Sequence, residues 1–310
     1  MKKQKKLLIT LGCSWTYGVG VGYTDGMTES DYRKISHDPK INDQFSFRGL
    51  LAAGLGFDNI NFSIGGSSNQ KQFRLAKEFF FSDKFKNLKN NYKEVVVLWG
   101  ITSTARNEFF DSKAKTYKSF FYDPGKTNND YKDWPLAKDF LLYSYDHDTS
   151  ILELAAEIRM FNVLFEHLKI KCIWFDTFNH HNYLKSTESQ YNIYRGITWP
   201  PFNNGDYIND PNISEEILQD INEKISTEFH LKNFLFFYNY PRDILSKILS
   251  TNVSNTTLQY HMSTWQCDNN NIKIATEQKL LNPYSFHPTK LGHREIAKIL
   301  ELEILKIMEK

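Results

Sequence analysis

Short apolar runs separated by polar or glycine-containing turns recur along the chain and predict buried β-strands. Four strands are expected, at residues 7–11, 57–62, 94–99 and 170–175. The Val-rich run at 94–99 is the clearest, because short apolar runs bounded by turn residues are typical of strands buried on both faces. The aromatic segment 231–240 is either a further strand or part of an insertion.

Between these runs, apolar residues recur at helical spacing. Helices are expected at residues 45–55, 71–89, 151–168, 214–230 and 288–308. Pro288 suits the first turn of the last helix. The polar, turn-rich residues 21–44 are expected to form a loop. Strands that alternate with helices predict an α/β fold, in which helices cover both faces of a parallel sheet.

Length and composition favour a globular protein with a sizeable core. The chain has 310 residues, of which 41% are hydrophobic and 24% are charged, and these values are ordinary for such a protein. We expect one domain over residues 1–310, with insertions near 109–145 and 177–282, where aromatic residues gather. Those aromatic rings either form small cores of the insertions or stack on sugar faces.

The charge and the apolar runs argue against several kinds of partner. A net charge of +2 gives no case for nucleic acid. No run approaches the ~20 apolar residues of a membrane-spanning helix. The basic residues 2–6 precede too short an apolar run for a signal peptide, so we expect a cytoplasmic protein. Three cysteines without CxxC spacing favour neither a disulfide framework nor a zinc site.

The first predicted strand ends in Gly12-Cys13-Ser14, which would put the Ser14 hydroxyl at the carboxyl edge of the sheet. Open α/β sheets bind their ligands at this edge. The backbone N–H of Ser14 could also stabilise an oxyanion. The alternative is a turn with a polar cap. Two further glycine-rich or polar turns, 63–69 and 100–104, follow neighbouring strands and should converge on the same edge.

A second candidate, His287, stands just before the C-terminal helix. From there its imidazole could reach Ser14 and act as a general base. The alternative is a loop histidine whose nitrogens are satisfied locally. His293 lies inside the predicted helix, and we expect it to be structural.

Four segments, in order along the chain, resemble the conserved blocks of the SGNH (GDSL-like) hydrolases. Residues 12–18, Gly-Cys-Ser-Trp-Thr-Tyr-Gly, resemble block I, and 61–66 resemble block II. The strand that ends in Trp99-Gly100 resembles the lead into block III, and residues 287–293 resemble block V. The Gly-Cys-Ser-x-Thr form is similar to a subgroup common in bacterial and bacteriophage genomes.

The resemblance implies a three-layer flavodoxin-like fold and hydrolysis of an ester without a cofactor. It assigns Ser14 as the nucleophile and one oxyanion donor, and His287 as the base. Gly66 would give a second backbone donor, with Gly65 as the alternative. Cys13 occupies the place of the block I aspartate, and we expect it to be structural, packed behind the turn.

Two departures from the family pattern bear on activity. Thr102 stands where block III has an oxyanion-donating asparagine, and Asn107 is a more distant substitute. Losing one such donor can lower the rate on the order of 10²–10³-fold. Tyr284 stands where block V has an aspartate, so His287 needs another partner. Asp268, Glu277 or a main-chain carbonyl could serve.

Other candidate residues are fewer. Asn69, Arg106 and Glu108 follow the strand ends and could bind a polar substrate, although Arg106 and Glu108 could equally form a solvated ion pair. His180 and His181 follow a strand, but no third ligand at recognisable spacing supports them, so no metal site is expected.

The leading hypothesis is a serine esterase of SGNH type that acts on a small-molecule or glycan ester, such as an O-acetyl or O-acyl carbohydrate. The rival, from another class, is a catalytically silent relative that uses the cleft only for recognition. It would be a binding module or a structural part of a virion, and assembly as a homo-oligomer is open in either case.

Overall fold

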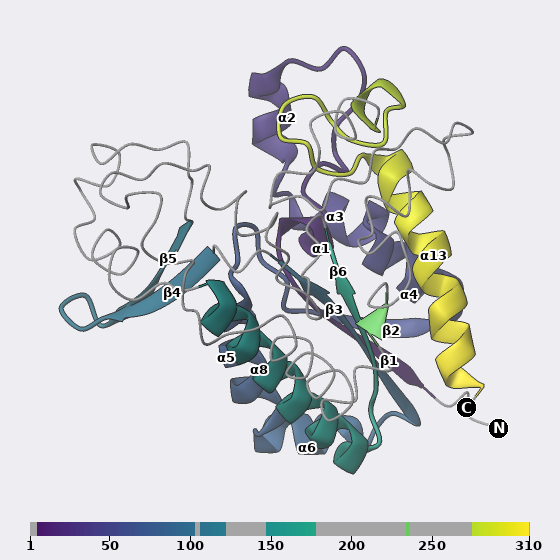
Figure 1. Cartoon of the computed structure of the whole chain (residues 1–310). Coiled ribbons are helices and arrows are strands. Elements are labelled where there is room, and N and C mark those ends of the chain that lie inside the picture. Colours follow the sequence, from purple (N-terminus) through teal and green to yellow (C-terminus); the bar gives the residue numbers. More distant parts are fainter. Residues whose placement is uncertain (1–4, 103–105, 122–146, 178–233, 236–274, 310) are drawn as a thin grey trace, which may run out of the picture.

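Five parallel strands form the central sheet (Figure 1). In this computed structural model, which describes residues 5–102, 106–121, 147–177, 234–235 and 275–309, the strands are β1 (Lys6–Leu11), β2 (Phe57–Asn61), β3 (Glu94–Ile101), β6 (Lys171–Asp176) and β7 (Phe234–Leu235). Their order across the sheet is β2-β1-β3-β6-β7. Counted along the chain, this is 2-1-3-4-5, the flavodoxin-like order. The predicted α/β fold is confirmed.

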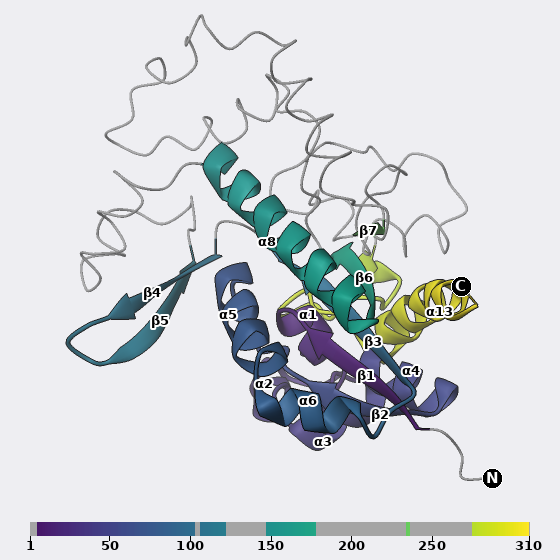
Figure 2. The same cartoon turned by 90° about the horizontal axis from the view of Figure 1, so that it is seen from below.

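Helices cover both faces of this sheet (Figures 1 and 2). One face carries α5 (Asn69–Phe80), α6 (Asp83–Lys89) and α8 (His147–Leu168). The other carries α4 (Phe47–Leu55) and α13 (Lys290–Met308). Because successive strand residues point to opposite faces, Leu7 and Ile9 of β1 belong to the first core and Leu8 to the second.

Aromatic side chains fill the core beneath α5 and α8. Trp99 and Trp174 are paired across β3 and β6 and stack with ring centroids 4.6 Å apart. Phe73 of α5 and Phe161 of α8 contact the Trp99 ring at 5.0 and 4.9 Å. Aromatic residues make up 15% of the chain, and part of them therefore serves the main core.

Two predictions for helices need correction. Residues 21–44, expected as a loop, contain α2 (Glu29–Ile35) and most of α3 (Pro39–Phe45). Thr28 caps the first by accepting from the Asp31 N–H, and Asp38 caps the second. The single helix expected at 71–89 is two, because Ser82 caps a new helix by accepting from the Phe85 N–H.

A β-hairpin follows β3 and includes the start of the insertion expected near 109–145. It consists of β4 (Arg106–Asp111) and β5 (Thr116–Phe121), which pair antiparallel and project from the body of the molecule (Figures 1 and 2). Within the insertion expected near 177–282, β7 joins the edge of the main sheet. The helix expected at 214–230 lies outside the described residues.

Candidate active site

Ser14 lies at the carboxyl edge of the sheet, as the first residue of the short helix α1 (Ser14–Tyr17). Gly12, between β1 and this helix, has φ +147° and donates its N–H to Gln72 Oε1 at 3.0 Å. A Cβ on Gly12 would collide with the Thr16 side chain and approach the Gly100 carbonyl oxygen to 2.9 Å. The tight turn that presents Ser14 therefore requires glycine.

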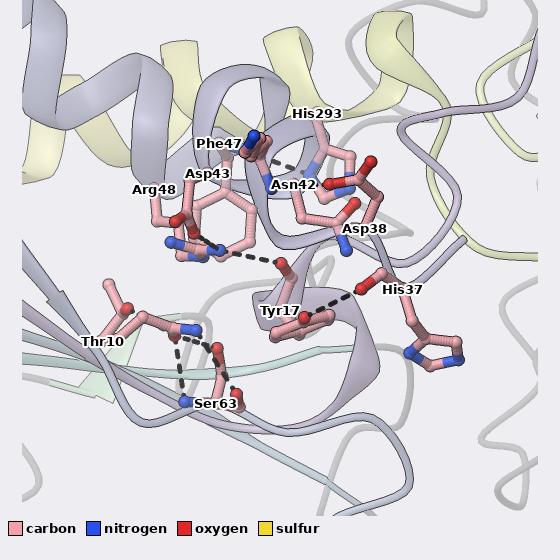
Figure 3. A network of polar contacts seen from close by, with 12 residues as sticks. Thr10, Tyr17, His37, Asp38, Asn42, Asp43, Phe47, Arg48, Ser63 and His293 are labelled. Atoms are coloured by element: carbon pink, nitrogen blue, oxygen red, sulfur yellow. Dashed lines mark hydrogen bonds and ion pairs between the residues drawn. The ribbon is translucent and has the colours of Figure 1, made fainter. Parts of the chain in front are cut away.

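Polar contacts from the neighbouring helices hold α1 in place (Figure 3). Arg48 of α4, 1% exposed, donates to the Tyr17 carbonyl at 3.2 Å and pairs with Asp43 at 2.5 Å. The Tyr17 hydroxyl donates to the His37 carbonyl at 3.3 Å. Because Tyr17 ends α1, these bonds fix the helix that begins with Ser14.

The loop that carries His287 packs directly on the turn after α1. Gly20, with φ +104°, lies so close that a Cβ on it would be 2.5 Å from the Pro288 carbonyl oxygen and 2.8 Å from the His287 Cβ. Glycine alone permits this approach at positive φ. Two segments that are distant in sequence thus meet at the site.

Ser14 and His287 face each other at hydrogen-bond distance. Nε2 of His287 lies 2.7 Å from Ser14 Oγ, and Nδ1 lies 2.8 Å from the Ser285 carbonyl oxygen and 3.0 Å from Ser285 Oγ. A carbonyl oxygen can only accept, so Nδ1 carries the ring proton. Nε2 therefore presents its lone pair to the Ser14 hydroxyl, which is the arrangement that a general base needs.

The Asn282 side chain organises the loop from Asn282 to His287. Its Oδ1 accepts from the N–H groups of Tyr284 and Ser285 at 3.1 and 2.9 Å, and its Nδ2 donates to the His287 carbonyl at 2.9 Å. These backbone groups fix the orientation of the amide, because an N–H only donates and a C=O only accepts.

The orientation of Asn282 in turn fixes the Ser285 hydroxyl. Ser285 Oγ donates to Asn282 Oδ1 at 3.1 Å, so it must accept from the Tyr32 hydroxyl, which lies 2.7 Å away. The remaining lone pair of Oγ faces the Nδ1–H of His287. Neutral groups from α2 and from the loop thus surround the far side of the imidazole.

His287 is uncharged near neutral pH in this environment. Burial lowers its pKa from 6.5 to about 4, against the opposing effect of the Ser285 carbonyl, and the charges of Arg106 and His37 lower it further. A neutral imidazole with a free Nε2 lone pair can take up the Ser14 proton.

A cavity of about 300 Å³ opens beside Ser14 and His287. Most of the residues that line it are of polar or charged type: Ser14, Glu29, Tyr32, Arg33, Ser36, His37, Arg106, Tyr284, Ser285 and His287. Gly65 and Gly66, from the turn after β2, also line it. Within the described residues, neither the Ser14 N–H nor the Gly66 N–H has a hydrogen-bond acceptor, so both are available to an incoming oxygen.

Thr102, directly after β3, and Asn69, the first residue of α5, form a hydrogen-bonded pair. The Thr102 N–H donates to Asn69 Oδ1 at 3.0 Å, and Asn69 Nδ2 donates to the Thr102 carbonyl at 2.7 Å. The Thr102 hydroxyl is buried without a partner among the described residues, and Thr102 is absent from the cavity lining. Each end of the Asn69 amide therefore holds one backbone group of Thr102.

Glu108 is an ion-pair partner of Arg74. Its carboxylate accepts from Arg74 at 2.9 and 3.0 Å, and its side chain is 4% exposed. Glu108 is therefore not a solvated carboxylate, because its side chain is buried against α5. Arg106 does line the cavity at Ser14.

Neither of the two candidate carboxylates for His287, Asp268 and Glu277, is seen in contact with its imidazole among the described residues. Glu277 is solvent-exposed, and both described contacts of His287 Nδ1 come from Ser285. Asp268, His180 and His181 lie outside the described residues. Cys13 is fully buried with the core beneath α4, and its Sγ lies 3.9 Å from Thr177 Oγ1.

The site contains residues that the sequence analysis did not single out: Tyr32, His37, Asn282 and Ser285. Asn282 carries a readable signal, because Asn followed by Pro favours a turn in which the Asn side chain bonds the backbone two residues on. Tyr32 carries none, since it reaches Ser285 across 253 positions of sequence.

No group of three or more metal-ligating side chains occurs in the parts of the chain described above. Among the same residues, no helix is both long and apolar enough to span a bilayer.

Comparisons with known proteins returned structural neighbours only. No protein-family model matches the sequence, and no curated protein matches it. The lipase Lip_vut3 from a goat rumen metagenome is 11% identical, with a TM-score of 0.35, over 96% of this chain and 97% of that chain. A protein described as a GDSL-like lipase, from Parabacteroides merdae, is 12% identical, with a TM-score of 0.38, over 98% and 96%. At these values, function has to be argued from the residues of the site.

Proposed function

We propose that the protein is a serine ester hydrolase in which Ser14 is the nucleophile and His287 is the general base. The observation that carries the proposal is the 2.7 Å contact from His287 Nε2 to Ser14 Oγ, combined with an Nδ1 that is held as a donor by the Ser285 carbonyl. A loop histidine satisfied locally would need neither the serine nor this tautomer.

In the proposed reaction, Ser14 Oγ attacks the ester carbonyl carbon while Nε2 of His287 takes the hydroxyl proton. The carbonyl oxygen becomes an oxyanion that accepts from the N–H groups of Ser14 and Gly66. Collapse of this intermediate breaks the bond to the alcohol oxygen, which receives the proton from Nε2, and leaves an acyl group on Ser14.

Water then attacks the acyl-enzyme. Nε2 takes one proton from the water and returns it to Ser14 Oγ as the carboxylic acid leaves. Throughout the cycle the Nδ1–H of His287 stays on the Ser285 oxygens. The chain therefore completes the reaction with its own side chains and water as the only co-reactant.

The lining of the cavity at Ser14 supports an ester with a polar alcohol part. Tyr32, His37 and Arg106 offer hydroxyl, imidazole and guanidinium groups around it. Carbohydrate hydroxyls are suitable partners for such groups, so we infer an O-acyl carbohydrate as the substrate class.

Hydrolysis of p-nitrophenyl acetate by the purified chain tests the proposal, with Ser14→Ala and His287→Ala as the site variants. Wild type should turn over, both variants should lose at least about 10²-fold in kcat, and a fluorophosphonate probe should label wild type but not Ser14→Ala. Labelling that survives in Ser14→Ala would remove Ser14 as the nucleophile. A folded wild type with no turnover and no labelling would favour a cleft that only recognises its ligand.

A further inference from the structure

Tyr284 carries an aromatic ring that the proposed reaction does not use. It lines the cavity at Ser14, and 38% of its surface is exposed. It also belongs to the loop that carries the proposed base, His287. Aromatic side chains with a few polar groups around them are typical of small-molecule sites. An exposed ring beside a nucleophile is therefore a surface that a substrate can contact.

The Tyr284 side chain is held in one orientation by its neighbours. Its N–H donates to Asn282 Oδ1 at 3.1 Å, and its hydroxyl donates to the Met27 carbonyl oxygen at 2.6 Å. Its ring centroid lies 6.0 Å from that of Tyr32 and 5.8 Å from that of Tyr23, which it meets edge-on. A ring that is already fixed loses little conformational freedom when a ligand binds, and this favours affinity.

The surface that Tyr284 adds to the cavity is apolar. Its hydroxyl is bonded to Met27, which is not among the described residues that line the cavity, so the ring remains to face a ligand. Arg106 and His37 line the same cavity with polar groups. A ligand that suits both surfaces needs an apolar face and polar groups around its edge. A pyranose sugar has both, since C–H bonds project from the faces of its ring and hydroxyls surround it, whereas an open-chain alcohol has no such face.

We propose that Tyr284 is a specificity-determining residue, whose ring stacks on the sugar ring in the alcohol part of the substrate. The inference rests on the proposed hydrolysis of an O-acyl carbohydrate at Ser14. It adds a preference for a cyclic sugar over an open-chain alcohol, which the Ser14–His287 pair alone does not create. Stacking holds the sugar equally in the ground state and the transition state, so its loss should raise KM and leave kcat in place.

The test compares the release of acetate from methyl glucosides acetylated at O2, O3 or O6 with its release from ethyl acetate. The ratio of kcat/KM for the best glucoside to that for ethyl acetate should be at least about tenfold in wild type. An aromatic contact contributes about three- to tenfold in binding. Tyr284→Leu, which keeps apolar bulk but removes the aromatic face, should therefore lower this ratio at least about threefold, through a higher KM for the glucoside.

Two further variants separate stacking from packing. Tyr284→Phe keeps the ring and loses only the bond to Met27, so the ratio should stay within about twofold of wild type. Tyr23→Leu is the matched control, because Tyr23 packs on the Tyr284 ring but lies outside the described cavity lining. It should keep the wild-type ratio. Each ratio compares two esters on one variant, so a general loss of turnover cancels.

The outcomes separate this inference from the proposed hydrolysis. Turnover of both esters with a ratio near one in wild type, or a ratio that Tyr284→Leu leaves unchanged, would overturn the stacking role and leave the hydrolase intact. An equal fall of the ratio in Tyr23→Leu would assign the effect to packing and overturn it as well.

Binding is measured separately, by NMR titration of Ser14→Ala with the acetylated glucosides, so that the stacking role is judged even if neither ester is hydrolysed. Adding Tyr284→Leu to Ser14→Ala should raise the Kd at least about threefold. A Kd that does not change, or no binding by Ser14→Ala, would refute the stacking role.

Discussion

Replacing Asn282 with alanine should disable His287 without touching either member of the Ser14–His287 pair. The side chain of Asn282 makes five hydrogen bonds, to backbone groups of the loop and to the Ser285 and Tyr32 hydroxyls. At roughly 1 kcal/mol for each bond, the loop loses several kcal/mol of its preference for this conformation. A displacement of about 1 Å can cost a site 10²-fold in rate, so we expect kcat to fall roughly 10²-fold.

The assay is steady-state turnover of p-nitrophenyl acetate beside a thermal melt. Asn162→Ala is the matched control. Asn162 is also a buried asparagine, but it lies in α8, where it accepts from Trp174 Nε1 at 2.8 Å, and it has no contact with His287 or its loop among the described residues. It should lose stability but keep kcat. Activity of Asn282→Ala within twofold of wild type, or a loss that merely parallels the melt in both variants, would refute the positioning role.

Four further predictions follow from the site. The kcat/KM profile should fall on the acid side with an apparent pKa near 4 instead of 6.5, because the half-buried His287 must be neutral; an acid limb near 6.5 would contradict this. In the folded chain the pKa of His287 is about 4 and that of His293 is about 3, both below the usual 6.5. The unfolded chain therefore binds more protons, and thermal melts should show the folded state losing stability as the pH falls from about 6.5 towards 3. Thr102→Val should leave kcat unchanged and stability level or higher, because the Thr102 hydroxyl is buried without a described partner; a 10²-fold loss would restore it as an oxyanion donor. Cys13→Ala should keep its activity and lose about 1 kcal/mol of stability, measured by denaturant titration.

The strands and the pair at the sheet edge could be predicted because their signals are local. Buried strands appear in the sequence as apolar runs, and parallel strands bring their carboxyl ends to one edge. The Gly12 turn therefore predicts the position of Ser14 at that edge. The short helices α2 and α3 escaped prediction because each buries a single residue, Tyr32 and Asn42 respectively. Because α2 and α3 lack an apolar stripe, their only sequence signals are the capping residues Thr28 and Asp38.

The sequence limits the hydrogen-bond partner of His287 Nδ1 to a few candidates but does not identify it. A main-chain carbonyl leaves no residue type to search for, and Ser285 was not distinguished from its neighbours. Tyr32 matters only because α2 folds over the loop, which depends on the aromatic packing of Tyr32 with Tyr23 and Tyr284 at 6.2 and 6.0 Å. Such contacts follow from the completed fold.

The neutral partners of His287 have a consequence for the kind of catalyst this site can be. A carboxylate would both select the tautomer and stabilise the imidazolium that forms during attack. The Ser285 carbonyl and hydroxyl select the same tautomer, but they bring dipoles in place of a full charge. Without that charge, burial dominates and holds the pKa of His287 near 4. The base is thus weaker as a proton acceptor but stays unprotonated well below neutral pH. We therefore infer that the maximal rate at this site is lower than with a carboxylate partner, but that activity extends to more acidic pH. The absence of an aspartate at position 284 is compatible with a slower hydrolase.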